Sequence, residues 1–168
     1  QTQRALGGEA AIVCAMSGNF VQRGDFAIVG RQARARAAVE SGVDLVLELP
    51  LPWAVSSAET FADGGAAVLA HTGVAAYLAF GSECGDADAL LETASCLLSP
   101  DYQAALRRRL DRGTPFAACR QEAVEELLGR SRAALLESPN NNLGVEYCKA
   151  LLRRGSAIRP LTVRRTGD

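Results

Sequence analysis

The stretch AAIVCAMSGNFVQRGD, residues 10–25, is the strongest indication of how this chain folds. Its apolar half, residues 10–15, is short and typical of a strand buried in a parallel sheet. A polar loop with two glycines follows directly, and open α/β sheets bind ligands outside the carboxyl ends of their strands. We therefore predict a strand followed by a possible ligand loop with the candidate residues Ser17, Gly18, Asn19, Gln22 and Arg23. An ordinary surface loop with an Arg23–Asp25 pair is the alternative.

The remaining sequence alternates in the same way between helical and apolar segments. Strand, helix and strand at this spacing predict parallel crossovers, hence an α/β fold with a doubly wound parallel sheet. Several helical segments in succession form an insertion at about residues 87–137. The expected helices cover residues 30–41, 56–70, 87–98, 100–110, 115–128 and 145–152, and the expected strands cover 10–15, 43–49, 74–80 and 158–165. Pro160 makes the last strand an edge strand.

Composition limits the classes of function that the chain can serve. With 168 residues and 48% hydrophobic content it is the size of one domain with a real core. The 18 basic and 19 acidic residues nearly cancel, so any RNA contact must use a local patch. No apolar run approaches the roughly 20 residues that cross a bilayer. The five scattered cysteines lack a CxxC pair, which favours reduced thiols in a cytoplasmic protein and no metal site.

Two further strand ends and the start of a helix carry candidate ligand residues. Gly81, at the end of the third expected strand, leaves bare backbone against which an adenine or ribose can lie, although turn geometry also explains it. In Pro139–Gly144, one of three asparagines can cap the following helix while the others meet a ligand, or the segment is only a capped turn. At the last strand, Arg164 and Arg165 suit a triphosphate, but neighbouring side chains on a strand point to opposite faces.

Two other features favour structural interpretations. The basic helix face formed by Arg107, Arg108, Arg109 and Arg112 is more typical of a solvated surface than of a phosphate-binding patch. The single histidine, His71, is best interpreted as solvated or as part of a helix cap. The sequence contains no Walker loop, no GxGxxG and no Ser-His-Asp set. These residues can therefore hold a nucleotide, while none of them indicates acid–base chemistry.

The motifs SGNFVQRG, DLVLELP, SAETFA, FGSE and PNNNLG occur in this order along nearly the whole chain. Together they resemble the bacterial tRNA(Met) cytidine acetate ligases, which belong to the nucleotidylyltransferase superfamily with a HIGH-type motif. The resemblance implies a Rossmann-like fold and an ATP-dependent ligase. Acetate and ATP would form acetyl-adenylate, and the acetyl group would pass to N4 of the wobble cytidine of elongator tRNA(Met). It also implies ATP contacts at Gly81, Asn141, Arg165 and Thr166, with Mg²⁺ as the expected companion of ATP.

The chain also departs from the family's pattern. The family begins with a strand and a His-x-Gly-His loop, and the chain starts after them and ends before a second phosphate-binding motif. The missing strand is central in the usual sheet order, so its neighbours should lack a shared partner. We expect residues 1–168 to be a partial catalytic domain that cannot complete adenylation alone, with its catalytic residues outside this chain. In GRQARARAA, Arg34 takes the family's arginine position, but Gln32 stands near where an aromatic is common.

Two other functions remain open from the residues. One is a related nucleotidylyltransferase that acts on a small metabolite. The other is a non-catalytic nucleotide- or RNA-binding module without the histidine motif.

Overall fold

The computed structural model describes residues 2–22, 24–111 and 113–165. Its strands are β1 (Val13–Ser17), β2 (Leu45–Leu49), β3 (Tyr77–Ser82) and β4 (Arg159–Arg164). Its α-helices are α1 (Thr2–Ala5), α2 (Arg31–Glu40), α3 (Leu51–Ala54), α4 (Ala58–His71), α5 (Ala87–Leu98), α6 (Pro100–Leu110), α7 (Phe116–Leu128), α8 (Arg130–Ala133) and α9 (Pro139–Arg153), and a 3₁₀ turn, η1 (Ala134–Glu137), precedes α9. The predicted α/β class with parallel strands is confirmed.

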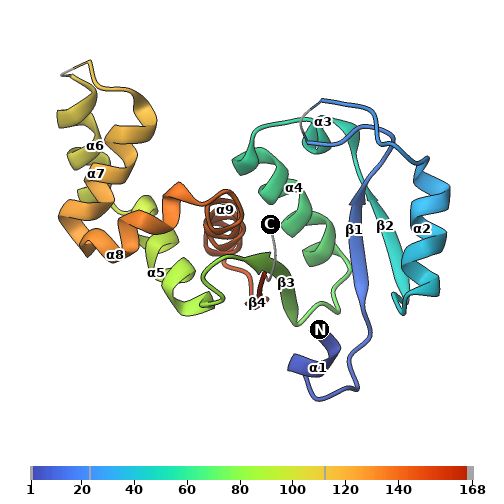
Figure 1. The fold of residues 1–168 in the computed structure, drawn as a ribbon. Coiled ribbons are helices and arrows are strands. Elements are labelled where there is room, and N and C mark those ends of the chain that lie inside the picture. The colour runs from blue at the N-terminus through green and yellow to red at the C-terminus, as the bar shows by residue number, and fades with distance from the viewer. Residues whose placement is uncertain (1, 23, 112, 166–168) are drawn as a thin grey trace.

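The strands form two parallel pairs rather than one continuous sheet. In the first pair Val13 of β1 lies opposite Leu45 of β2, and in the second Tyr77 of β3 lies opposite Arg159 of β4. Figure 1 shows α2 beside β2, while helices α5–α8 extend as a lobe on the far side of α9. Among the described strands, none pairs with both β1 and β3.

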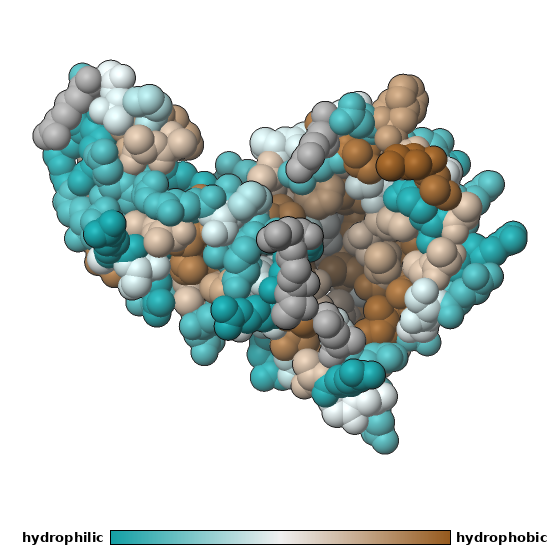
Figure 2. All heavy atoms as spheres, viewed as in Figure 1, coloured by the Kyte–Doolittle hydropathy of each residue, from teal (hydrophilic) through white to brown (hydrophobic). Residues whose placement is uncertain are grey.

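An apolar cavity of about 720 Å³ separates the two strand pairs. Its walls come from Val13–Ala15 of β1, Tyr77–Ala79 of β3 and the side chain of Phe61 on α4. Tyr147 of α9 also lines it, and burial raises the pKa of this phenol to about 12. Figure 2 shows the hollow on the right of the molecule with hydrophobic residues around it. Each strand pair therefore presents one edge to an open apolar space.

The closed core lies on the other side of β3. Leu90 and Ala94 of α5, Val124 of α7 and Val145 of α9 are completely buried in one cluster. A smaller cluster joins Leu78 of β3 to α4 and α9. The inserted helices thus pack through α9 onto the β3–β4 pair.

The observed elements differ from expectation mainly at their ends. Strand β1 continues to Ser17 because Met16 and Ser17 pair with Glu48 and Leu49 of β2. Helix α3 was not predicted; it places Pro52 in its first turn, where the missing N–H costs no hydrogen bond. The largest difference is α9, which begins at Pro139 and not at Val145. The three asparagines are therefore part of the helix and not of a preceding loop.

Candidate nucleotide-binding site

Gly81 and Arg165 face each other where β3 and β4 end. A Cβ atom built on Gly81 would lie 3.2 Å from Cγ of Arg165, so the space between them depends on the absence of a side chain. The backbone N–H of Arg165 donates to the carbonyl oxygen of Ser82 (2.9 Å), which continues the ladder past the last paired residue. Both residues line a cavity of about 580 Å³ together with Arg164. The structure thus brings two predicted ATP residues together; the third, Thr166, lies outside the described residues.

A hydroxyl pair fixes the ends of these two strands. The Oγ of the fully buried Ser82 lies 2.6 Å from Oγ1 of Thr162 on β4. The same Ser82 oxygen accepts a hydrogen bond from the N–H of Gly85 (3.0 Å) and so closes the loop after β3. Gly85 has a φ of +67°, and a Cβ there would lie 2.8 Å from Cβ of Arg164. A side chain at this position would strain the loop and displace β4.

The carboxylate of Glu83 caps α9 from across the fold. It accepts hydrogen bonds from the backbone N–H groups of Asn140 (3.0 Å) and Asn141 (2.6 Å) and from Nδ2 of Asn140 (2.8 Å). Burial opposes ionisation of this carboxyl, but the hydrogen bonds from Asn140 and Asn141 outweigh burial and lower its pKa below the ordinary value. A negative charge at a helix N-terminus is also favoured by the helix dipole.

Asn141 completes a reciprocal contact between α9 and the loop after β3. Its Oδ1 accepts the N–H of Cys84 (3.0 Å), and only 4% of the residue is exposed. It is not among the described residues that line the 580 Å³ cavity. In this structure Asn141 therefore supports the segment Gly81–Gly85 from behind. Its predicted contact with ATP stays a prediction.

The loop after β1 is held closed by helix α2. Arg34 donates from Nε to the carbonyl oxygen of Val29 (2.9 Å) and from Nη2 to those of Ser17 (3.0 Å) and Gly18. The Oδ1 of Asn19 accepts the N–H of Arg31, the first residue of α2 (3.3 Å). The family's arginine position is thus filled by a residue that binds the loop backbone.

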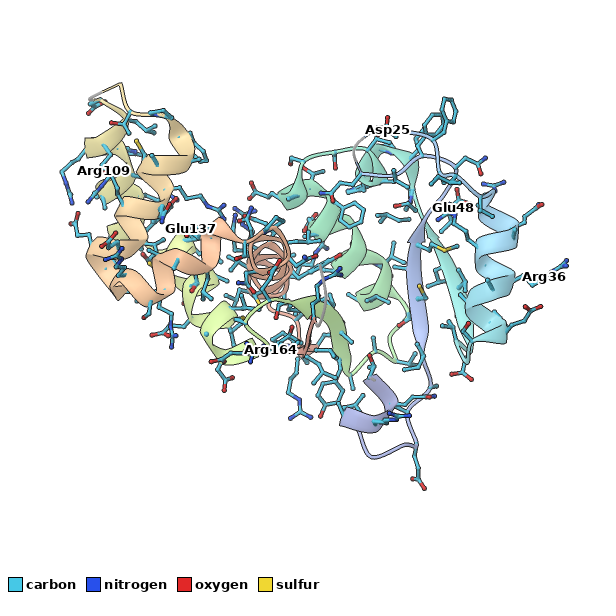
Figure 3. The ribbon with its side chains drawn as sticks, in the orientation of Figure 1. Asp25, Arg36, Glu48, Arg109, Glu137 and Arg164 are labelled. Atoms are coloured by element: carbon cyan, nitrogen blue, oxygen red, sulfur yellow. The ribbon has the colours of Figure 1, made fainter. Side chains whose placement is uncertain are left out.

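This loop belongs to the β1–β2 pair and does not join Gly81 and Arg165 around the 580 Å³ cavity. The candidates Ser17, Gly18, Asn19 and Gln22 are absent from the described lining of that cavity, and Arg23 lies outside the described residues. Figure 3 shows the separation, with Arg164 at the β3–β4 pair and Glu48 at the β1–β2 pair. The structure thus brings together the predicted segments that contain Gly81, Asn141 and Arg165.

The arginine face of α6 is largely paired within the protein. Arg108 contacts Glu126 of α7 (2.9 Å), and Arg109 contacts both Glu126 (2.6 Å) and Glu122 (3.4 Å). Arg107 is exposed, and Arg112 lies outside the described residues. These ion pairs favour the structural interpretation of the basic face over an RNA-binding patch.

The remaining sequence features have structural roles. Nδ1 of the exposed His71 lies 2.7 Å from the carbonyl oxygen of Ala67, one helical turn earlier. All five cysteines are free, and burial raises the pKa of the Cys148 thiol to about 12. The described part of the chain holds no group of three or more His, Cys, Asp or Glu side chains placed to bind a metal ion. None of its helices is long and apolar enough to span a membrane.

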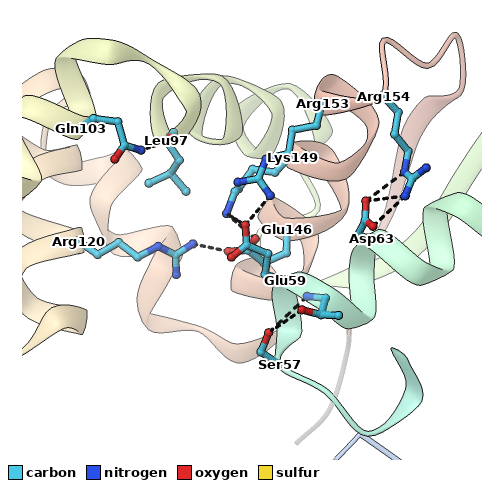
Figure 4. A network of polar contacts seen from close by, with 11 residues as sticks. Ser57, Glu59, Asp63, Leu97, Gln103, Arg120, Glu146, Lys149, Arg153 and Arg154 are labelled. Atoms are coloured by element: carbon cyan, nitrogen blue, oxygen red, sulfur yellow. Dashed lines mark hydrogen bonds and ion pairs between the residues drawn. The ribbon is translucent and has the colours of Figure 1, made fainter. Parts of the chain in front are cut away.

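Sequence reasoning missed two sets of residues. The sequence showed Glu83 only as part of the motif FGSE. Its role as the cap of α9 was missed because its partners Asn140 and Asn141 are 57 and 58 residues away. Arg120, Glu146 and Lys149 form a buried ion-pair group (Figure 4). Glu146 and Lys149 lie three residues apart among the apolar residues of the segment 145–152, and that spacing of opposite charges was the available signal.

Comparison with known proteins identifies the family. The model of the HIGH nucleotidyl transferase family matches residues 1–168. This chain belongs to that family. Among solved structures, Thermotoga maritima TmcAL bound with alpha-thio ATP superposes with a TM-score of 0.93 at 38% identity and covers 99% of this chain. The apo form of the same protein also reaches 0.93, at 37% identity.

Two curated relatives of this HIGH nucleotidyl transferase chain are named tRNA(Met) cytidine acetate ligase. The protein of Acetivibrio thermocellus is 41% identical over 172 residues, and that of Caldanaerobacter subterraneus subsp. tengcongensis is 46% identical over 159 residues. These matches cover 100% and 93% of this chain but only 41% and 40% of the relatives. The chain therefore spans about two fifths of the length of the relatives that it matches.

Proposed function

We propose that this chain forms the nucleotide-binding part of the catalytic domain of an ATP-dependent tRNA(Met) cytidine acetate ligase. The observation that carries the proposal is the pair Gly81 and Arg165 at the cavity where β3 and β4 end. The Thermotoga neighbour, with a TM-score of 0.93, was crystallised with alpha-thio ATP. The names of the curated relatives favour this ligase over a metabolite nucleotidylyltransferase and over a non-catalytic module.

In the proposed reaction, a carboxylate oxygen of acetate attacks the α-phosphorus of ATP. Acetyl-adenylate forms and pyrophosphate leaves. The N4 amine of the wobble cytidine of elongator tRNA(Met) then attacks the acetyl carbonyl carbon, and AMP leaves. The reaction would take place in the cytoplasm, where tRNA is available.

This chain's own residues would bind ATP and stabilise its charge. Gly81 offers bare backbone to the adenosine, because a side chain there would fill the space beside Arg165. The guanidinium of Arg165 suits a phosphate, and Thr166 would extend the same contact. Asn141 would contact the nucleotide directly, or it would position the nucleotide-binding loop through the Cys84 amide that it already binds. Mg²⁺ would accompany the phosphates and neutralise part of the leaving pyrophosphate's charge.

Two variants test the nucleotide site. Arg165→Ala removes the cation, and Gly81→Val fills the space in front of it. We expect each to weaken ATP binding by tenfold or more. Arg165→Ala loses a hydrogen bond to a charged group, which contributes about 1.5–3 kcal/mol, and Gly81→Val fills space that the nucleotide would need. Arg159→Ala is the matched control, because Arg159 lies at the opposite end of the same strand. Calorimetric titration with ATP measures the affinities, and binding within twofold of the unaltered protein for both variants would contradict the assignment.

The ligase reaction itself is tested in the protein that carries this chain. We expect acetate-dependent exchange of pyrophosphate into ATP and transfer of labelled acetate to tRNA(Met). Exchange that depends on another small acid, with no labelling of tRNA, would favour the metabolite-specific alternative.

A further inference from the structure

One face of α9 carries four polar residues that connect three parts of the fold. Asn142, Glu146, Lys149 and Arg153 follow at intervals of four, three and four residues, which places them in one row along the helix. Arg120 of α7 donates to Oδ1 of Asn142 and to Oε1 of Glu146, both at 2.7 Å. From the other side, Glu59 of α4 accepts Lys149 (3.2 Å) and Arg153 (2.5 Å) (Figure 4).

The middle of this row is shielded from water. The side chains of Glu146, Lys149 and Arg120 are only 6%, 10% and 16% exposed. A buried ion pair of this kind is weak evidence for a role in stability, since well-packed apolar side chains often serve as well. Arg120 does something that an apolar side chain cannot do. Its planar fork binds an amide oxygen and a carboxylate oxygen at once, and it thereby fixes the direction of both.

The residue that Arg120 fixes lies in the first turn of α9, next to the nucleotide site. Asn142 directly follows Asn141, whose Oδ1 accepts the N–H of Cys84. The backbone amides of Asn140 and Asn141 donate to Glu83. Glu83 and Cys84 belong to the short loop that starts at Gly81. Four residue-to-residue contacts thus connect α7 of the inserted helices with the proposed ATP-binding loop.

We propose that Arg120 is a positioning residue for the nucleotide site: through Asn142 it orients the first turn of α9, and through that turn it orients the loop Gly81–Gly85. The inference rests on the proposed function, because it assigns Arg120 to ATP binding at the same site. The inserted helical segment accordingly contributes to the geometry of the site although it is separate from the strand ends.

Hydrogen exchange tests the mechanical part of this proposal without any nucleotide. Arg120→Met removes both hydrogen bonds of the guanidinium, and we expect exchange of the Cys84 and Asn141 amide protons to accelerate by about tenfold relative to core amides of α5. The control Arg108→Met removes an exposed cation from the same helical segment and should leave both amides unchanged. If Arg120→Met does not fold, Asn142→Ala breaks the same contact and keeps the Glu146–Lys149 pair. Unchanged exchange in a folded variant would overturn the inference.

ATP affinity tests the functional part. In calorimetric titrations well below the unfolding temperature, Arg120→Met should raise the Kd for ATP by about tenfold, a change of about 1.4 kcal/mol. Arg120→Lys keeps the charge but lacks the fork, and should give an intermediate Kd. Faster exchange with a Kd within twofold of the unaltered protein would reduce Arg120 to a structural residue and overturn the proposal. If the unaltered protein binds no ATP, the proposed function fails, and the exchange data still decide whether Arg120 holds the loop.

Discussion

The two strand pairs have the same parallel geometry but very different surroundings. Leu78 and Ser82 of β3 are 3% and 0% exposed, and Leu78 packs with residues of α4 and α9, whereas every residue of β1 is only half-buried. Helix α2, which covers β2, has no buried residue. Most of the exposed large apolar side chains among the described residues also belong to this half: Phe26, Ile28, Val29, Val39, Leu45, Leu51, Trp53 and Val55. The proposed nucleotide site thus lies on the half with a closed core, where buried contacts hold the strand ends and the loop.

The largest expected effect is the loss of a buried charge on the closed half. Glu146→Ala leaves Arg120 and Lys149 without their shared carboxylate, and we expect the free energy of unfolding to fall by about 3–5 kcal/mol. On the open half, Glu48→Ala removes the exposed partner of Arg31 and should cost about 0–1 kcal/mol. Urea unfolding measures both. Equal losses would show that the two halves do not differ in this way.

Apolar packing gives the second comparison, with leucine substituted in both halves. Leu90→Ala creates a cavity in the closed core, where the side chain is 0% exposed, and should cost about 2–5 kcal/mol. Leu45→Ala on β2 removes a side chain that is 47% exposed, and should cost about 1 kcal/mol or less. A larger loss for Leu45→Ala in the same unfolding assay would contradict the assignment of the core.

The cap of α9 predicts a smaller effect that depends on pH. The folded state lowers the pKa of Glu83, so its contribution is present above the ordinary value of 4.5 and is lost as pH falls through the folded value. Glu83→Gln should cost about 0.5–2 kcal/mol at pH 7 and should flatten the loss of stability below about pH 4.5.

Glu40→Gln is the matched control for that experiment, because Glu40 is an exposed carboxylate in α2 of the open half. Thermal melts between pH 3 and pH 7 measure the difference. If Glu83→Gln and Glu40→Gln have the same pH profile, Glu83 does not cap α9 in solution.

The smallest expected effect concerns the arginines of α6. Because Arg108 and Arg109 are paired with Glu122 and Glu126, Arg108→Met in the full protein that carries this chain should leave the salt dependence of the proposed tRNA(Met) binding unchanged. An arginine that contacts a phosphate would instead lower the log–log slope by about one. A filter-binding series in salt distinguishes the two. A reduced slope would restore the interpretation of this face as an RNA contact.

The local pattern of the sequence predicted most of the elements but not how they meet. Alternating apolar and helical segments located the strands β1–β4 to within a few residues. Hydrophobic periodicity, and the Gly and Pro residues that end helices and strands, are local properties of the sequence. The start of α9 was placed six residues too late, because its cap is Glu83, which lies far away in sequence. Asparagines before a helix are typical of a capped turn, and only the tertiary contact shows that these lie inside the helix.

The candidate site was predictable to a similar degree. Gly81 and the pair Arg164 and Arg165 were named from strand ends, which share one edge in parallel sheets, and the family resemblance selected Arg165. The structure brings Gly81 and Arg165 together. The loop after β1 was named for the same reason, but its described residues do not line the 580 Å³ cavity, and Arg34 of α2 binds its backbone. No local pattern could indicate which strand ends would be neighbours. The contact from Arg120 to Asn142 joins residues 22 positions apart and was equally invisible.

The central claim is that ATP binds where β3 and β4 end. Titration of the ¹⁵N-labelled protein with ATP tests it most directly, because amide shifts report contacts residue by residue. We predict that the largest changes occur at the amides of Gly81, Cys84 and Arg165, with little change at Gly18 and Asn19. Changes confined to the β1 loop, with Gly81 and Arg165 unmoved at saturating ATP, would contradict the claim.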